Sequence, residues 1–168
     1  MPLFNMTDLR AQLPRGHRLL GLDPGSRVIG LALSDVSLLL ATPHSQIPRG
    51  KLAAAVSAIR KLVRTEAVGG LVVGLPLSMD GTAGPAAQAA RDWTHALSRA
   101  IGLPASMWDE RLSSAAVNRF LIQEADATRQ RRAAVVDQMA AAYMLQAALD
   151  ASQVRARRPE TCQGTARP

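Results

Sequence analysis

The first apolar segments of the chain are short and are separated by turn residues. Residues 19–22 are continuously apolar, which predicts a central strand that is buried on both faces and ends at Asp23. Pro24 and Gly25 then turn the chain, and residues 28–34 and 37–42 have the composition of two further strands. Three short strands in succession predict an antiparallel meander.

Beyond residue 50, apolar residues recur at intervals of three and four positions, which is the period of an amphipathic helix. Short apolar runs between these helical segments predict two more strands. The predicted helices are residues 51–65, 85–100, 113–123 and 127–150, and the additional strands are residues 71–73 and 105–108. A loop rich in glycine and proline, residues 74–84, leads from the fourth strand into the second helix.

This order of elements predicts an α/β protein with a five-stranded mixed sheet, in which three antiparallel strands are followed by parallel strands and helices cover both faces. It is the order of the ribonuclease H-like fold. The same order opens each half of actin-like ATPases and sugar kinases, so it does not determine the function. We expect one such domain over residues 18–150, an N-terminal arm over residues 1–17, and a disordered basic tail over residues 151–168.

The charge of the chain favours a nucleic-acid partner. The 168 residues carry a formal net charge of +7, from 20 Lys and Arg against 13 Asp and Glu, and nearly all the cations are arginines. Arginine matches phosphate oxygens with two parallel hydrogen bonds, although an arginine-rich codon composition would produce the same bias. Cys162 is the single cysteine, which argues against disulfides and thiolate zinc sites. With no secretory or membrane segment visible, we expect a cytoplasmic protein without a membrane partner.

Asp23 closes the first buried strand, where a carboxylate is unusual unless it has a partner. The alternative is a turn former that bonds its own backbone, as aspartate often does before Pro-Gly. Glycines at positions 21, 25 and 30 surround Asp23 and would let a phosphate backbone approach the sheet closely. Asp35, at the end of the second strand, fits the turn interpretation better.

Asp109 and Glu110 follow the last predicted strand at its carboxyl end, the usual place for active sites in sheets with parallel strands. Successive side chains at a strand end point to opposite faces, so only one of the two needs to reach a site directly. The alternative is that they favour the amino-terminal end of the helix predicted from Ser113. The neighbouring Arg111 either contacts phosphate or neutralises these carboxylates.

Asp137 lies on the small apolar face of the last helix, which it shares with Ala141 and Ala148. A charge on that face needs a partner, and Arg131 or Arg132 would provide one in a structural ion pair. A bound metal would satisfy the carboxylate equally well. If Asp23, Asp109, Glu110 and Asp137 converge, they form an oxygen-rich site for Mg²⁺, with Mn²⁺ as a possible substitute. Arg129, Arg131 and Arg132 would then lie where a phosphate strand passes such a site.

Four segments of the chain resemble, in order and spacing, the signature blocks of the YqgF/RuvX family. The segments are LDPGSRVIGLALSD (residues 22–35), VVGLPLSMDGTAGP (72–85), DERLSSAAV (109–117) and VVDQMAAAYMLQAALD (135–150). This family comprises RuvC-like Holliday junction resolvases and pre-16S ribosomal RNA nucleases. The resemblance spans about residues 18–150 and implies a ribonuclease H-like fold.

The resemblance also implies that Asp23, Glu110 and Asp137 are the catalytic acids, with Asp109 adjacent in the same motif. The family's basic residue before Ile-Gly is Val28 in this chain, and Arg27 is a candidate to replace it as a nucleic-acid contact. Compared with RuvC-type resolvases, no acid follows the fourth strand at Gly74-Leu75-Pro76. The central ligand must therefore come from the Asp109-Glu110 motif.

The function expected from these residues is metal-dependent hydrolysis of nucleic-acid phosphodiester bonds, foremost in maturing the 5′ end of precursor 16S ribosomal RNA. A Holliday junction resolvase acting on branched DNA is the alternative nuclease. A non-catalytic nucleic-acid-binding factor on the same scaffold is the alternative of another class, and the chain is too short for the two domains of an actin-like ATPase. Both a monomer and a homodimer fit the sequence.

Overall fold

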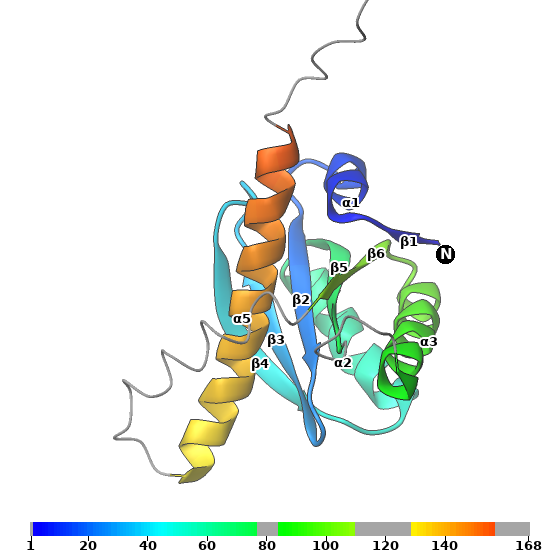
Figure 1. The fold of residues 1–168 in the computed structure, drawn as a ribbon, viewed down its shortest axis with the longest axis vertical. Coiled ribbons are helices and arrows are strands. Elements are labelled where there is room, and N and C mark those ends of the chain that lie inside the picture. The colour runs from blue at the N-terminus through cyan, green and yellow to red at the C-terminus, as the bar shows by residue number, and fades with distance from the viewer. Residues whose placement is uncertain (1, 77–83, 110–128, 157–168) are drawn as a thin grey trace, which may run out of the picture.

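The structure, a computed structural model, describes residues 2–76, 84–109 and 129–156, with the backbone alone at 129–137 and 154–156. The helix predicted at 113–123 and most of the basic tail lie outside these residues. Within them, a mixed sheet is covered by helices on both faces (Figure 1).

The sheet has the strand order β1-β6-β5-β2-β3-β4. Its strands are β1 (Leu3–Phe4), β2 (Arg18–Pro24), β3 (Val28–Ser34), β4 (Ala41–Pro48), β5 (Val68–Leu75) and β6 (Ala105–Asp109). Strands β2, β3 and β4 are antiparallel neighbours, whereas β5 and β6 run parallel to β2. The ribonuclease H-like arrangement predicted from the sequence is therefore confirmed.

The sheet has six strands rather than the predicted five, because the N-terminal residues contribute one. Strand β1 pairs in parallel with β6 and leads into helix α1 (Met6–Gln12). The side chain of Asn5 caps this helix by accepting a hydrogen bond from the Asp8 N–H at 2.8 Å. Met6 and Leu9 are buried, so part of the expected N-terminal arm packs against the sheet.

The helices divide between the two faces of the sheet. Helices α2 (Leu52–Thr65) and α3 (Pro85–Ile101) pack on one face, while α1 and the long helix α5 (Arg129–Ala156) pack on the other. Pro85 begins α3, and Gly102, with a φ of 82°, ends it in the left-handed conformation. Helix α5 continues six residues beyond Asp150. Its Ser152 is buried and accepts a hydrogen bond from Arg10 at 3.1 Å.

The third strand begins later than the sequence predicts, at Ala41 rather than at Ser37. The carboxylate of Asp35 accepts hydrogen bonds from the backbone N–H groups of Leu39 at 2.7 Å and Leu40 at 3.0 Å. Leu38 lies in the left-handed region with a φ of 56°. These bonds hold residues 35–40 in a turn, as expected for Asp35. No helix among the described residues meets the length and hydropathy needed to cross a bilayer.

Candidate functional site

Asp23 lies at the carboxyl end of β2, the central parallel strand of the sheet. It is opposite Gly30 of β3, and the pairing of Leu22 with Val73 brings it beside Gly74 of β5. Alternation along β2 puts Asp23 on the same face as Leu19 and Gly21, which is the face covered by α5. Asp23 as a whole residue is half-buried.

Gly21 allows α5 to approach this strand closely. A Cβ atom at Gly21 would lie 2.9 Å from the Leu145 Cβ and 3.4 Å from the Ala141 carbonyl oxygen. A Cβ at Gly25 would lie 2.8 Å from the Val28 carbonyl oxygen, so this glycine serves the β2–β3 turn. Helix packing and the turn thus account for two of the three glycines from which we expected phosphate access.

Helix α5 runs antiparallel to β2, so its N-terminal half lies toward the end of the sheet that carries Asp23 (Figure 1). From Gly21 to Asp23 the strand advances about 6.6 Å. From Ala141, which meets Gly21, back to Asp137 the helix advances about 6 Å. The helical backbone at Asp137 is therefore level with Asp23, while the Asp137 side chain lies outside the described atoms.

Asp109 ends β6 at the same edge of the sheet, two strands away from Asp23. It is in register with Leu75, and it alternates with Met107, which packs with Leu75 against α3. Asp109 therefore belongs to the α3 face, opposite the face of Asp23. Glu110 and Arg111, the next two predicted site residues, lie outside the described part of the chain.

The predicted phosphate-binding arginines are placed only in part. Arg27 is exposed in the turn between β2 and β3, close in sequence to Asp23. Arg129, Arg131 and Arg132 form the first turn of α5, at the Asp23 end of the sheet, where the backbone alone is described.

Arg49 is a neighbour of this site that the sequence pattern did not reveal. Its guanidinium donates a hydrogen bond to the Gly25 carbonyl oxygen at 2.6 Å, and its backbone N–H donates one to the Arg27 carbonyl oxygen at 2.9 Å. These bonds tie the end of β4 to the turn after Asp23. The sequence shows only an arginine directly after the segment that forms β4. The register between β4 and β3 is needed to place this arginine at the turn after Asp23.

The described residues alone do not assemble a metal site. Among them, no group of three or more His, Cys, Asp and Glu side chains could hold a metal ion. Of the four predicted ligands, only Asp23 and Asp109 have described side chains. Carboxylate oxygens nevertheless suit Mg²⁺, and Asp23 occupies an edge at which the other acidic segments also arrive.

A central strand with a carboxylate at its end, in a sheet of this order crossed by a long helix, defines a ribonuclease H-like protein. A family model described as RuvX, Holliday junction resolvase, matches residues 17–151. The chain belongs to this RuvX family.

Proteins that are similar to this chain in sequence come from several bacteria. A protein of Gluconacetobacter diazotrophicus named "Putative pre-16S rRNA nuclease" is 67% identical over 152 residues, which is 90% of this chain and 99% of the relative. A Gluconobacter oxydans protein of the same name is 64% identical over 93% of this chain and 98% of its own. Among solved structures, T. thermophilus RuvC in complex with Holliday junction substrate is similar with a TM-score of 0.49 and 13% identity, over 84% of this chain and 96% of that one.

Proposed function

We propose that this protein is a metal-dependent nuclease that matures the 5′ end of precursor 16S ribosomal RNA. The RNA substrate is supported by the name of relatives that are 67% and 64% identical over nearly their whole length. The hydrolytic chemistry is supported by the position of Asp23 at the carboxyl end of the central strand, which is the observation that carries the proposal. Precursor ribosomal RNA is made in the bacterial cytoplasm, where we also place the protein.

Asp23, Glu110 and Asp137 are the residues that would hold the metal ion. A bound Mg²⁺ or Mn²⁺ supplies an activated water and stabilises negative charge on the scissile phosphate. Asp23 is suited to this role because it pairs with Gly30 of β3 and directly follows Leu22, which pairs with Val73 of β5, so its backbone position is fixed. Asp137 would bring its carboxylate from the helix that crosses β2 at that level.

Glu110 is favoured over Asp109 as the direct ligand from β6. Asp109 is in register with Leu75 and belongs to the α3 face, whereas the face of Asp23 is the α5 face. Because side chains alternate along a strand, the residue after Asp109 is the one suited to the face of Asp23. Asp109 would then contribute charge near the site.

Arginines around the site would hold the substrate by its backbone. Arg27 is exposed in the turn that follows Asp23, and Arg49 is anchored on the same turn. Arg111, Arg129, Arg131 and Arg132 follow or precede the proposed acidic ligands in sequence. Contacts to phosphates give affinity with little base preference, so the specificity for the processing site would come from RNA shape.

The proposal is tested by the substitution Asp23→Asn, assayed for Mg²⁺-dependent cleavage of a precursor 16S RNA fragment. Cleavage should disappear while the fold and most RNA binding are retained, because only one metal-binding charge is removed. Asp35→Asn, the same change at the other end of the sheet, is the control and should cleave normally. Glu110→Gln should behave like Asp23→Asn, and Asp109→Asn should keep part of the activity. Normal cleavage by Asp23→Asn rejects the nuclease assignment.

A Holliday junction resolvase is the second candidate, favoured by the description of the family model that matches residues 17–151. The precursor RNA and a four-way DNA junction are therefore compared in the same buffer, with the same Mg²⁺ concentration. Preferential cleavage of the junction would show that branched DNA, rather than the precursor RNA, is the substrate. Binding of either nucleic acid without cleavage, in protein with full metal loading, would favour the non-catalytic factor.

A further inference from the structure

Helix α2 belongs to a long basic stretch of the chain. Residues 36–65 contain no aspartate or glutamate, and residues 49–64 contain five cations. These are Arg49, Lys51, Arg60, Lys61 and Arg64, and all five are exposed. The helix covers the sheet face opposite α5, so this positive surface is separate from the arginines at the start of α5.

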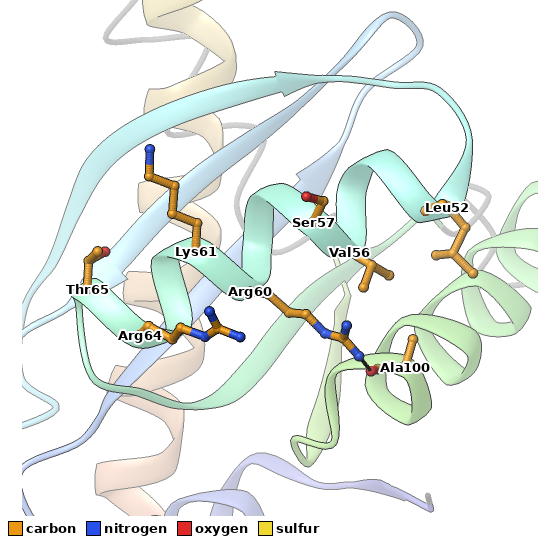
Figure 2. A pocket seen from close by; sticks show the side chains of 9 residues that line it. Leu52, Val56, Ser57, Arg60, Lys61, Arg64, Thr65 and Ala100 are labelled. Carbon is orange, nitrogen blue, oxygen red and sulfur yellow. Dashed lines mark hydrogen bonds between the residues drawn. The ribbon is translucent and has the colours of Figure 1, made fainter.

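A hollow of about 660 Å³ lies along α2 and reaches the end of α3 (Figure 2). Its walls include Val56, Ser57, Arg60 and Arg64 of α2 and Ala100 of α3, without a carboxylate among its lining residues. Figure 2 shows the side chains of Arg60 and Arg64 leaving the same side of the helix and Lys61 leaving an adjoining side, and all three line the hollow. The hollow therefore offers hydroxyl and guanidinium donors to an anion.

The three cations of α2 have different surroundings. Arg60 donates a hydrogen bond to the Ala100 carbonyl oxygen at 2.6 Å, which satisfies a free carbonyl near the C-terminal end of α3. Lys61 and Arg64 have no hydrogen bond or ion pair with any residue that the structure describes. Like charges one turn apart destabilise a helix, and no acid on α2 offsets them.

The arrangement of these cations suits a polymer of phosphates better than a small anion. A small anion is usually held by donors that converge, whereas these cations extend from Lys51, at the N-cap of α2, to Arg60, Lys61 and Arg64 in its last two turns, about 20 Å along the helix. The basic stretch begins at Arg49, which is bonded to the turn after Asp23. A polymer of phosphates bound at Arg49 would extend along α2, away from the end of the sheet that carries Asp23.

We propose that the α2 surface formed by Ser57, Lys61 and Arg64 binds the phosphates of an RNA strand that leads away from the site at Asp23. The identity of the polymer rests on the proposed function, whereas the phosphate chemistry rests on the charges and the hollow. The surface adds affinity for RNA that extends beyond the cleavage site. It leaves the chemical step unchanged, since Lys61 and Arg64 lie near the C-terminal end of α2, which packs on the sheet face opposite that of Asp23.

The test compares the full-length protein with a Lys61→Gln, Arg64→Gln double variant. Glutamine is a good helix former, so the exposed helix should persist. The matched control is Arg15→Gln with Arg91→Gln, which removes the same charge from exposed positions that do not line the hollow. Binding is measured with Asp23→Asn in every protein, so that the RNA stays intact whether or not the wild type cleaves it.

Two RNAs are used as probes, a precursor fragment trimmed to the cleavage junction and the same fragment with its single-stranded leader. For the leader RNA, the slope of log Kd against log salt should fall by about 1.4 in the double variant, since each phosphate contact with a single strand contributes roughly 0.7. The trimmed RNA and the control variant should keep the parental slope.

An unchanged slope for the leader RNA, or an equal fall for both RNAs or in the control, overturns the proposal for α2. Because binding is read without cleavage, a wild type that binds through Lys61 and Arg64 but does not cleave would refute the nuclease and leave this surface standing.

Discussion

At Gly21, the absence of a side chain decides how closely α5 packs on the central strand. A methyl group there would lie 2.9 Å from the Leu145 Cβ. Because each Cβ is bonded directly to the backbone, a side-chain rotation cannot relieve this contact. Gly21→Ala should therefore lower the free energy of unfolding by about 1 to 3 kcal/mol, the usual cost of overpacking a core. Chemical denaturation measures this difference.

Gly50 provides the matched control for that substitution. A Cβ at Gly50 meets nothing within 4 Å, so Gly50→Ala should be neutral or slightly stabilising through the unfolded chain. Equal effects of the two substitutions would show that α5 can shift to accept a side chain at Gly21.

Asp35 makes the turn between β3 and β4 depend on pH. Hydrogen bonds from the backbone, first from Leu40 and then from Leu39, hold the pKa of its carboxyl below the usual 3.8, although burial raises it. A depressed folded-state pKa contributes stability above pH 3.8, and this contribution is lost as the pH falls through the lower folded-state pKa.

Asp35→Asn should consequently lower the melting temperature at neutral pH, with a loss of about 1 kcal/mol for a hydrogen bond to a charged group on a solvent-facing turn. The difference between parent and variant should shrink as the pH falls below 3.8. Melting curves over a pH series measure it. A difference that is constant with pH would mean that the charge of Asp35 is not what holds the turn.

At the scale of elements, α1 is part of the core although it lies in a mostly polar segment. Leu9 is fully buried, and a Cβ at Gly70 of β5 would lie 3.1 Å from the Leu9 Cδ1 atom. Leu9→Ala should cost about 2 to 5 kcal/mol, as for other buried leucines. Gln12→Ala, an exposed change at the end of the same helix, is the control. Equal melting temperatures for Leu9→Ala and Gln12→Ala would show that the N-terminal segment does not contribute to the cooperative fold.

At the scale of the whole molecule, the proposed site requires chain segments more than a hundred residues apart, since Asp23 ends β2 and Asp137 belongs to α5. A metal-binding carboxylate near other acids destabilises the fold when the ion is absent, whereas a carboxylate paired with Arg131 or Arg132 stabilises it always. Asp137→Asn should therefore raise the melting temperature in Mg²⁺-free buffer and remove the stabilisation by Mg²⁺. A large loss of stability without metal would instead show a structural ion pair.

The sequence by itself determined the strands and helices whose cores are strongly apolar. Residues 19–22 lie within β2, and the helical period beyond residue 50 gave α2, α3 and α5, because burial depends on side chains that the sequence shows directly. It also placed Asp23 at a strand end. Strand β1 was not predicted, because two residues are too few to show a periodic pattern of apolar side chains. They form a strand only by pairing with β6.

Tertiary structure decided which residues share a face and which turns are joined. The alternation of β6 assigns Asp109 to the α3 face only once its register with Leu75 is known. Arg49 meets the turn after Asp23 only because β4 pairs with β3, and Gly21 is explained only by the approach of α5. These features depend on contacts between distant segments, which a local pattern of side chains does not contain.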